Sequence, residues 1–117
     1  MDARTTLKKN SDFRRLYAKG KNAVTPYLVV YCRPNRQAQS RFGFTVSAKL
    51  GHAVVRNRIR RQLREICRLH ASELPAGTDF ILVARSRCVK GDYHKMEQAF
   101  LSACDKLGLL GKETLAE

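Results

Sequence analysis

The segment from Val55 to His70 sets an apolar stripe opposite a row of arginines, and this pattern limits the possible folds more than any other feature. On a helical wheel, four apolar side chains share a narrow arc and five polar ones lie on the other side. The apolar set is Val55, Ile59, Leu63 and Ile66, and the polar set is Asn57, Arg60, Arg61, Arg64 and Arg68. The pattern predicts an amphipathic helix that packs its stripe against other elements and leaves its arginines outside.

Three further segments read as strands. Tyr27–Arg33 is rich in β-branched and aromatic residues, is ended by Pro34 and is followed by a polar loop over 35–40. Arg41–Ala48 alternates between apolar and small or polar residues, which predicts a strand with one buried and one exposed face. After a break at 75–77, Phe80–Arg85 reads as a buried strand. The apolar members of the alternating segment are Phe42, Phe44 and Val46.

Two more helices flank this arrangement. Ser11 is suited to cap a short first helix that ends at Gly20, with Gly20 in the left-handed conformation. Asp92 is suited to cap a last helix closed by Gly108. The inward positions of the first helix are Phe13, Leu16 and Tyr17, and those of the last are Tyr93, Met96, Phe100, Ala103 and Leu107.

The order of elements, α-β-β(-β)-α-β-α, predicts an α+β fold in which helices cover a small mixed sheet. The 117 residues fit one domain, and no repeat, low-complexity tract or linker divides them. We therefore expect a single domain over 1–117, with residues 1–9 frayed.

The charge is concentrated in the first part of the chain. The net charge is +13, and residues 1–70 hold 17 basic and 3 acidic side chains. Such a surface faces a polyanion. The longest apolar run has six residues, too few to cross a bilayer, and the first ten residues lack the apolar segment of a secretory signal. We expect a cytoplasmic protein, not bound to a membrane, whose four dispersed cysteines are reduced and mostly buried.

Charged residues opposite an apolar stripe are often only a solvated face, but that face usually mixes signs. Here Arg56, Arg60, Arg64 and Arg68 repeat at i+4 steps, and Glu65 is the only acid between Val55 and His70. Like charges at this spacing destabilise a helix, and the arginine fork suits phosphate. The helix is therefore predicted to bind nucleic acid.

The run from Arg41 to Glu65, RFGFTVSAKLGHAVVRNRIRRQLRE, resembles the signature of the protein subunit of bacterial ribonuclease P. Its core is Arg56-Asn57-Arg58, which follows a turn that begins at Lys49. Residues 11–20 and 79–85 are similar to the first helix and the last strand of that family.

The resemblance implies a small, non-catalytic partner of a large catalytic RNA, which together remove the 5′ leader of precursor tRNA. It implies that the Arg-Asn-Arg helix region contacts the catalytic RNA and that a cleft between the first helix and the sheet holds the leader. It also implies a left-handed β-α-β crossover, although such connections are right-handed in about 98% of cases. The residues we expect at the catalytic RNA are Lys49, Arg56, Asn57, Arg58, Arg60, Arg61, Arg64 and Arg68. Those expected in the leader cleft are Phe13, Arg14, Tyr17, Tyr31 and Arg33.

Phe13 and Tyr17 have two possible roles. An aromatic pair at helical spacing normally docks its helix on the core. However, basic residues surround this pair, and aromatic faces in a basic setting stack on single-stranded bases. We expect a mixed role, in which Leu16 packs and the two aromatic rings line the cleft.

The sequence offers no active site of its own. Hydrolysis of a phosphodiester by protein groups needs metal-binding carboxylates or a histidine pair. The acids of residues 1–70 are widely spaced, and the three histidines, including His52 beside the Arg-Asn-Arg turn, are scattered. We expect no catalytic residue, no metal or cofactor on the protein alone, Mg²⁺ in the RNA-containing holoenzyme, and one protein per RNA.

Two other classes remain open. A ribosomal or other structural RNA-binding protein would have the same composition but no need of a second, single-strand site. A DNA-binding helix module is less compatible, because the final helix and sheet do not fit an ordinary helix-turn-helix and the basic helix lacks residues typical of base readout.

Overall fold

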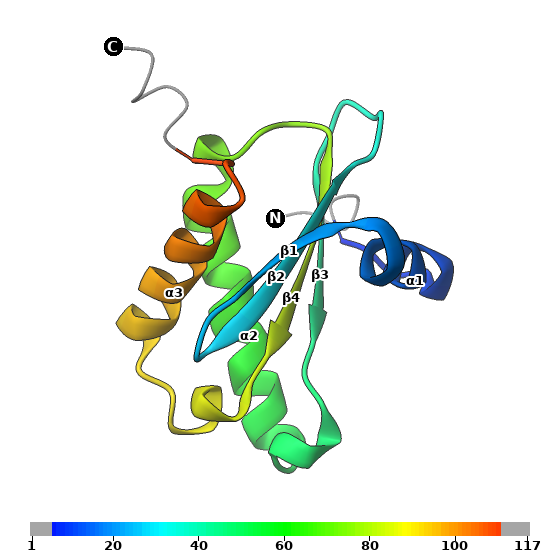
Figure 1. Cartoon of the computed structure of the whole chain (residues 1–117). Coiled ribbons are helices and arrows are strands. Elements are labelled where there is room, and N and C mark those ends of the chain that lie inside the picture. Colours follow the sequence, from blue (N-terminus) through cyan, green and yellow to red (C-terminus); the bar gives the residue numbers. More distant parts are fainter. Residues whose placement is uncertain (1–5, 111–117) are drawn as a thin grey trace.

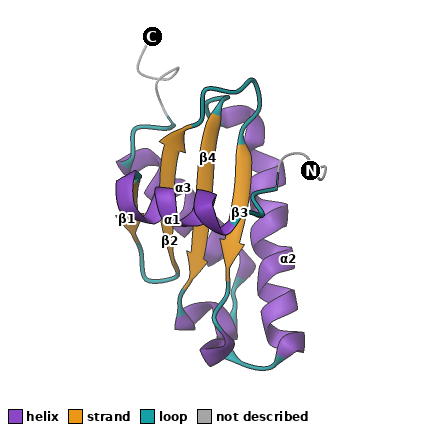
Figure 2. Cartoon of the chain, turned by 90° about the vertical axis from the view of Figure 1, so that its right-hand side faces the viewer, coloured by secondary structure: helices purple, strands orange, loops and turns teal. Residues whose placement is uncertain are grey.

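The computed structural model describes residues 6–110, and its elements form three layers (Figure 1). Helix α1 covers one face of a four-stranded sheet, and helices α2 and α3 cover the other (Figures 1 and 2). The helices are α1 (Asn10–Lys19), α2 (Ala53–His70) and α3 (Tyr93–Lys106). The strands are β1 (Lys21–Val24), β2 (Leu28–Pro34), β3 (Arg41–Thr45) and β4 (Thr78–Ala84). The predicted α+β fold with a mixed sheet is confirmed.

The sheet has the order β1-β2-β4-β3. Strands β1 and β2 form an antiparallel pair, β2 and β4 are antiparallel, and β3 and β4 are parallel. Strands β3 and β4 are therefore joined through α2 by a crossover connection, whose left hand stays a prediction. The optional third strand before the basic helix is β1, which the sequence did not reveal because it has four residues and one buried position.

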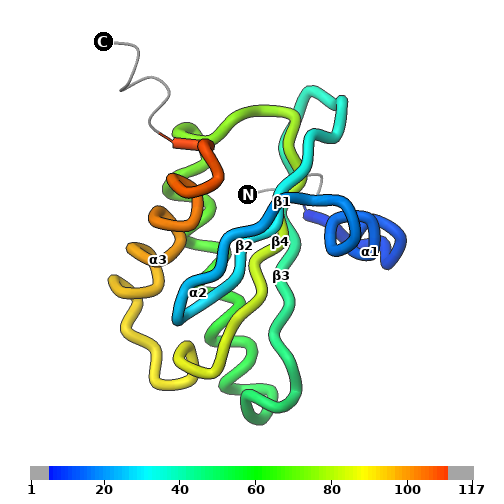
Figure 3. The backbone as a smooth tube through the Cα atoms, viewed as in Figure 1, coloured from blue at the N-terminus to red at the C-terminus, as the bar shows by residue number. Residues whose placement is uncertain are grey.

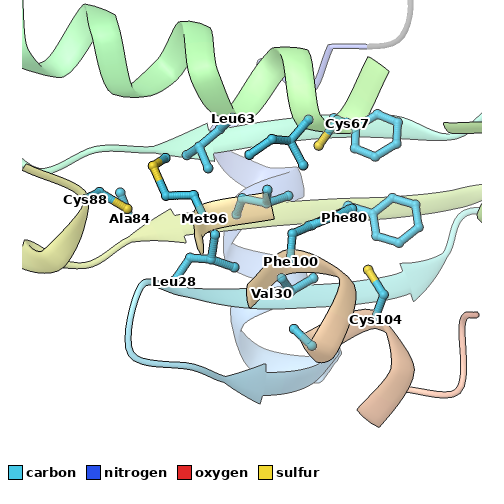
Figure 4. Packing of buried hydrophobic residues seen from close by; sticks show 14 of the residues in the cluster. Leu28, Val30, Leu63, Cys67, Phe80, Ala84, Cys88, Met96, Phe100 and Cys104 are labelled. Carbon is cyan, nitrogen blue, oxygen red and sulfur yellow. The ribbon is translucent and has the colours of Figure 1, made fainter. Parts of the chain in front are cut away.

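The main core lies between the sheet and the two helices α2 and α3 (Figure 4). Ile59, Leu63 and Ile66 are fully buried and Val55 packs against the core partly buried, which confirms the apolar stripe of the basic helix. They pack with Phe80 of β4 and Phe100 of α3 in one cluster. Burying a leucine- or phenylalanine-sized side chain contributes about 1.5–3 kcal/mol, so this stripe fixes which face of α2 points outward.

All four cysteines are free and buried, as predicted. Burial raises the pKa of Cys104 to about 12, so its thiol stays protonated at neutral pH. Over residues 6–110, no helix combines the length and hydropathy that crossing a membrane requires.

A second, smaller core lies under α1 and consists of Leu7, Leu16 and Ile81. Two predictions are wrong here. Leu7 is not frayed, because its amide donates to the Phe42 carbonyl at 2.9 Å and its side chain is buried. The second face of β3 is not open at Gly43, because Leu7 and Phe13 cover it. Of the segment predicted to fray, residues 1–5 lie outside the described residues.

The ends of α1 also differ from the prediction. Lys9 precedes the helix without a side-chain cap, and Ser11 lies within the first turn. Gly20 is extended, with φ −77°, so it does not close the helix in the left-handed conformation. Its lack of a side chain serves packing, because a Cβ there would lie 2.7 Å from the Leu16 carbonyl oxygen and 2.9 Å from that of Cys32.

The ends of the last helix are as predicted. Asp92 accepts from the amides of His94 and Lys95, at 2.9 Å and 3.2 Å. Gly108, with φ +75°, closes α3 in the left-handed conformation.

Candidate nucleic-acid interface

The approach to α2 is a tight turn. Ser47 accepts from the Lys49 amide at 3.1 Å at the start of a 3₁₀ helix over Ala48–Leu50. Gly51 follows with φ +146°, a backbone conformation that residues with a side chain rarely adopt. The Arg56 side chain returns to this turn and donates from Nε to the Gly51 carbonyl at 3.1 Å. Lys49 and Arg56 are thus held beside the first turn of α2, with Lys49 exposed.

The outer face of α2 carries the predicted arginine ladder. Arg61, Arg64 and Arg68 are exposed, and Arg60 is partly exposed. Arg60 donates to Asn57 Oδ1 at 3.1 Å, which uses one of its five N–H groups. The Arg64 guanidinium lies over the Phe44 ring, 5.8 Å from its centre, which tethers it to β3.

One acid interrupts the positive charge of this face. Glu65 accepts two hydrogen bonds from Arg68, at 2.9 Å and 2.6 Å. The hydrogen bond from Arg68 holds the pKa of Glu65 below its ordinary value. Within residues 6–110, no carboxylate pairs with Arg56, Arg60 or Arg64. The positive charge of these three members of the ladder is therefore not neutralised by a carboxylate of the described residues.

Arg58 differs from the rest of the set. Its Nη2 donates to the carbonyls of Cys88 and Val89, at 3.2 Å and 2.5 Å. These carbonyls belong to a 3₁₀ helix over Ser86–Lys90, which precedes α3. The Arg58 side chain therefore joins α2 to the segment before α3, and its predicted RNA contact stays a prediction. Nothing in the sequence indicated this contact, because the partners lie 30 and 31 positions away.

Three aromatic side chains meet at α1, as the sequence predicted. Tyr17 packs edge to face against Tyr31 of β2, with ring centres 5.0 Å apart, and Phe13 lies 6.4 Å from Tyr17. Tyr17 is 41% exposed, and its hydroxyl hydrogen-bonds Thr45 of β3 at 2.8 Å. We call Phe13, Tyr17 and Tyr31 the aromatic cluster. Phe13 packs over Gly43 whereas Tyr17 stands out, so the two rings divide the packing and exposed roles between them.

The sheet beside this cluster offers an apolar floor that the sequence did not reveal. Val24 pairs with Val29, Val29 with Val83, and Val83 with Thr45, so these residues form a row across all four strands. Val24 is 53% exposed, and the two inner valines are partly exposed. Figure 2 shows that α1 crosses the strands and leaves part of this sheet face uncovered.

Arg33 and Arg14 lie apart from the aromatic cluster. On α1, Leu16 points into the core, with Phe13 and Tyr17 on one flank and Asp12 and Arg15 on the other. Arg33 lines a pocket together with Asp12 and Arg15, on the second flank. Arg14 is exposed on the outside of the helix. The structure thus brings together three of the five residues expected in the leader cleft.

The described part of the chain contains no group of three or more histidine, cysteine or carboxylate side chains able to hold a metal. Arg41 engages two carboxylates: it donates to Asp79 from Nε at 2.9 Å and from Nη2 at 2.7 Å, and it lies 3.5 Å from Asp12. This arrangement does not fit a magnesium ion. His52 is exposed before α2 and makes no capping hydrogen bond with its side chain.

The buried stripe, the outward arginines and the aromatic cluster define a small basic α+β protein whose charged helix packs on one face of the sheet and whose other face is partly open. The family model described as Ribonuclease P matches residues 1–108. The chain belongs to the ribonuclease P protein family, as its motifs predicted.

Individual relatives cover almost the whole chain. The ribonuclease P protein component of Desulforamulus reducens is 44% identical over 102 residues, which are 87% of this chain and 90% of that protein. That of Natranaerobius thermophilus is 41% identical over 110 residues, covering 94% and 96%. Among solved structures, the RNase P protein of Staphylococcus aureus is 32% identical with a TM-score of 0.83, covering 91% and 97%. The RNase P protein of Thermotoga maritima is 30% identical with a TM-score of 0.75, covering 83% and 92%.

Proposed function

We propose that this chain is the protein component of a ribonuclease P ribonucleoprotein that removes the 5′ leader of precursor tRNA. The outer face of α2 binds the catalytic RNA. The aromatic cluster and the valine floor beside it bind the single-stranded leader. The RNA, with Mg²⁺, breaks the bond, and the protein contributes counter-charge and position.

One observation carries the proposal. Ile59, Leu63 and Ile66 of the apolar stripe are fully buried, while Arg56, Arg60 and Arg64 lie on the other side of α2 without a carboxylate partner among the described residues. A helix that keeps this much like charge is less stable alone than one with mixed charges. A phosphate backbone relieves the repulsion, because each arginine replaces a counterion of the nucleic acid.

The open sheet face supports the second half of the proposal. Tyr17 exposes part of its ring and is held by Tyr31 and Thr45. A held aromatic face stacks on a base with little loss of side-chain entropy, and one stacked base contributes about 1–3 kcal/mol. The floor of valines binds a strand through shape and apolar contact, which suits leaders of differing sequence.

The chemistry is assigned to the RNA because Arg41 engages two carboxylates of the described residues, Asp12 and Asp79. Asp12 and Asp79 are neutralised by Arg41, so neither is free to hold a metal or activate water. Mg²⁺ bound by the RNA would supply the activated water and would stabilise the developing charge. We place the protein in the cytoplasm, with one copy per RNA.

Cleavage of leader-bearing tRNA at low Mg²⁺ tests this function. We expect the catalytic RNA alone to be slow, the protein alone to be inactive, and the two together to restore cleavage with a correct mature 5′ end. Cleavage by the protein without RNA would refute the assignment of the chemistry. If the protein did not change the activity of the RNA, a structural RNA-binding role would replace the proposed one.

A further inference from the structure

A charged pocket of about 490 Å³ lies on the flank of α1 away from the aromatic cluster. It is bounded by α1, by the ends of β2, β3 and β4, and by the loop after β2. Its basic lining residues are Lys9, Arg15, Arg33, Arg36 and Arg41. We call it the α1 pocket.

The floor of the α1 pocket is a row of charges across three strands. Arg33 of β2 pairs in register with Asp79 of β4, which pairs in register with Arg41 of β3. Helix α1 therefore separates two unlike parts of one sheet face. On one side lies the row of valines, and on the other this row of charged residues.

The acids of the pocket are fully used within the protein. Buried Asp79 accepts two hydrogen bonds from Arg41 and one from Asn35 Nδ2, at 2.8 Å. Buried Asp12 lies 3.5 Å from Arg41 and 3.3 Å from Arg15. The two carboxylates and the two arginines cancel in charge and form a rigid base, because buried carboxylates need such partners.

Three cations remain. Within residues 6–110, no carboxylate lies within 4.0 Å of Lys9, Arg33 or Arg36. Arg36 also has φ +61°, which is uncommon for a residue with a side chain. Asn35 stabilises this turn. Its side-chain Oδ1 accepts from the backbone N–H of Gln37 at 2.7 Å, and its backbone N–H donates to the Gly77 carbonyl at 2.8 Å.

We propose that the α1 pocket is a separate RNA-binding site, in which Lys9, Arg33 and Arg36 bind phosphates of the RNA backbone. The inference rests on the proposed function and adds a surface that neither α2 nor the aromatic cluster includes. The lining is polar and carries no exposed aromatic ring, so it suits phosphate and not a base. Arginine binds phosphate through two parallel hydrogen bonds, and the neutral base beneath leaves the three cations free for it.

The source of the phosphates is either the catalytic RNA or the leader. Helix α1 has ten residues, about 15 Å, and the aromatic cluster occupies its other flank. A strand of a few nucleotides can therefore reach from one flank to the other over the exposed side of the helix. The catalytic RNA can equally reach the pocket from the edge at β3.

The test is a triple variant, Lys9→Gln with Arg33→Gln and Arg36→Gln. Its control is Lys90→Gln with Lys95→Gln and Lys106→Gln, which removes the same charge from exposed positions near and on α3. Affinity is measured against salt, first for the catalytic RNA and then for the holoenzyme with leader-bearing and mature tRNA. Each lost phosphate contact lowers the salt slope by about 0.7–0.9, so the pocket variant loses about 2 in slope and on the order of 100-fold in affinity at 0.15 M salt.

A loss with the catalytic RNA assigns the pocket to that RNA, and a loss confined to leader-bearing tRNA assigns it to the leader. A loss no larger than that of the control in both measurements overturns the proposal. If the triple variant unfolds, Lys9→Gln with Arg36→Gln, both at exposed positions, tests the same site with a slope loss of about 1.5. A double variant of α2, Arg60→Gln with Arg64→Gln, is measured in parallel. It distinguishes failure of the pocket proposal from failure of the proposed function. If it weakens binding and the pocket variants do not, only the pocket proposal fails, and if the native protein binds neither RNA, the proposed function fails as well.

Discussion

Replacing Tyr17 with alanine separates its stacking role from its packing role. The Tyr17 ring packs against Tyr31, and its hydroxyl hydrogen-bonds Thr45. An aromatic pair contributes about 0.5–1.5 kcal/mol and a hydrogen bond about as much, so we expect Tyr17→Ala to lower the free energy of unfolding by about 1–3 kcal/mol. Loss of one stacked base costs a further ~1–3 kcal/mol of leader binding, which is roughly 5- to 150-fold in affinity.

The assay compares the affinity of the holoenzyme for leader-bearing and mature tRNA, beside urea unfolding of the protein alone. Destabilisation of the protein affects both tRNAs equally, whereas lost stacking affects only the one with a leader. Tyr17→Phe is the matched control, because it removes the hydroxyl and keeps the ring, and we expect its leader affinity to stay within roughly threefold of the native protein. Equal losses on both tRNAs with Tyr17→Ala would show that this ring only packs.

Three other perturbations act on different parts of the structure. Arg60→Ala with Arg64→Ala should reduce the salt slope of catalytic-RNA binding by about 1.5, and an unchanged slope would remove both arginines from the contact surface. Ile59→Ala should lower the free energy of unfolding by about 2–5 kcal/mol, because this side chain is fully buried, and RNA binding by the folded fraction should be normal. Burial lowers the pKa of His70, whereas the hydrogen bonds of its ring to Glu97, at 2.6 Å, and to Glu73 raise the pKa. Together the two carboxylates outweigh the burial, so the pKa of His70 lies above the ordinary 6.5. The charged His70 therefore stabilises the fold below about pH 6.5, and this contribution is lost as the pH rises through the folded-state pKa. Urea midpoints should fall over this range in the native protein and much less in His70→Gln, and equal pH profiles would contradict the role of His70.

The sequence predicted the elements that carry their own periodicity. Helix α2 was found from its apolar stripe, and its burial is as expected, because an 18-residue helix repeats the pattern several times. Strand β1 was missed because four residues cannot establish a period. The first face of β3 was predicted correctly, but its second face was not, because α1 returns to cover Gly43 from more than twenty positions away.

In the candidate site, too, the contacts that follow from local spacing could be predicted, and those between distant positions could not. Phe13 and Tyr17 were paired by helical spacing, and Tyr31 was placed with them by its strand face. The partners of Arg58 and of Arg41 depend on tertiary contacts, since Arg41 meets Asp79 across 38 positions. Asp12 is one of only three acids among the first 70 residues, and its presence among basic residues was the available sequence signal that some arginines form ion pairs within the protein.

Strand β4 lies between β2 and β3, although it follows both in the chain (Figure 3). While the ribosome is still making residues 78–84, β2 and β3 have no neighbour on their inner sides. All seventeen basic residues of the first seventy have by then been polymerised. Because chains are made from the N-terminus, this cationic stretch leaves the exit tunnel before the strand that organises it, beside a particle that is itself mostly RNA. The sheet that positions these basic side chains is therefore complete only after β4 has been made.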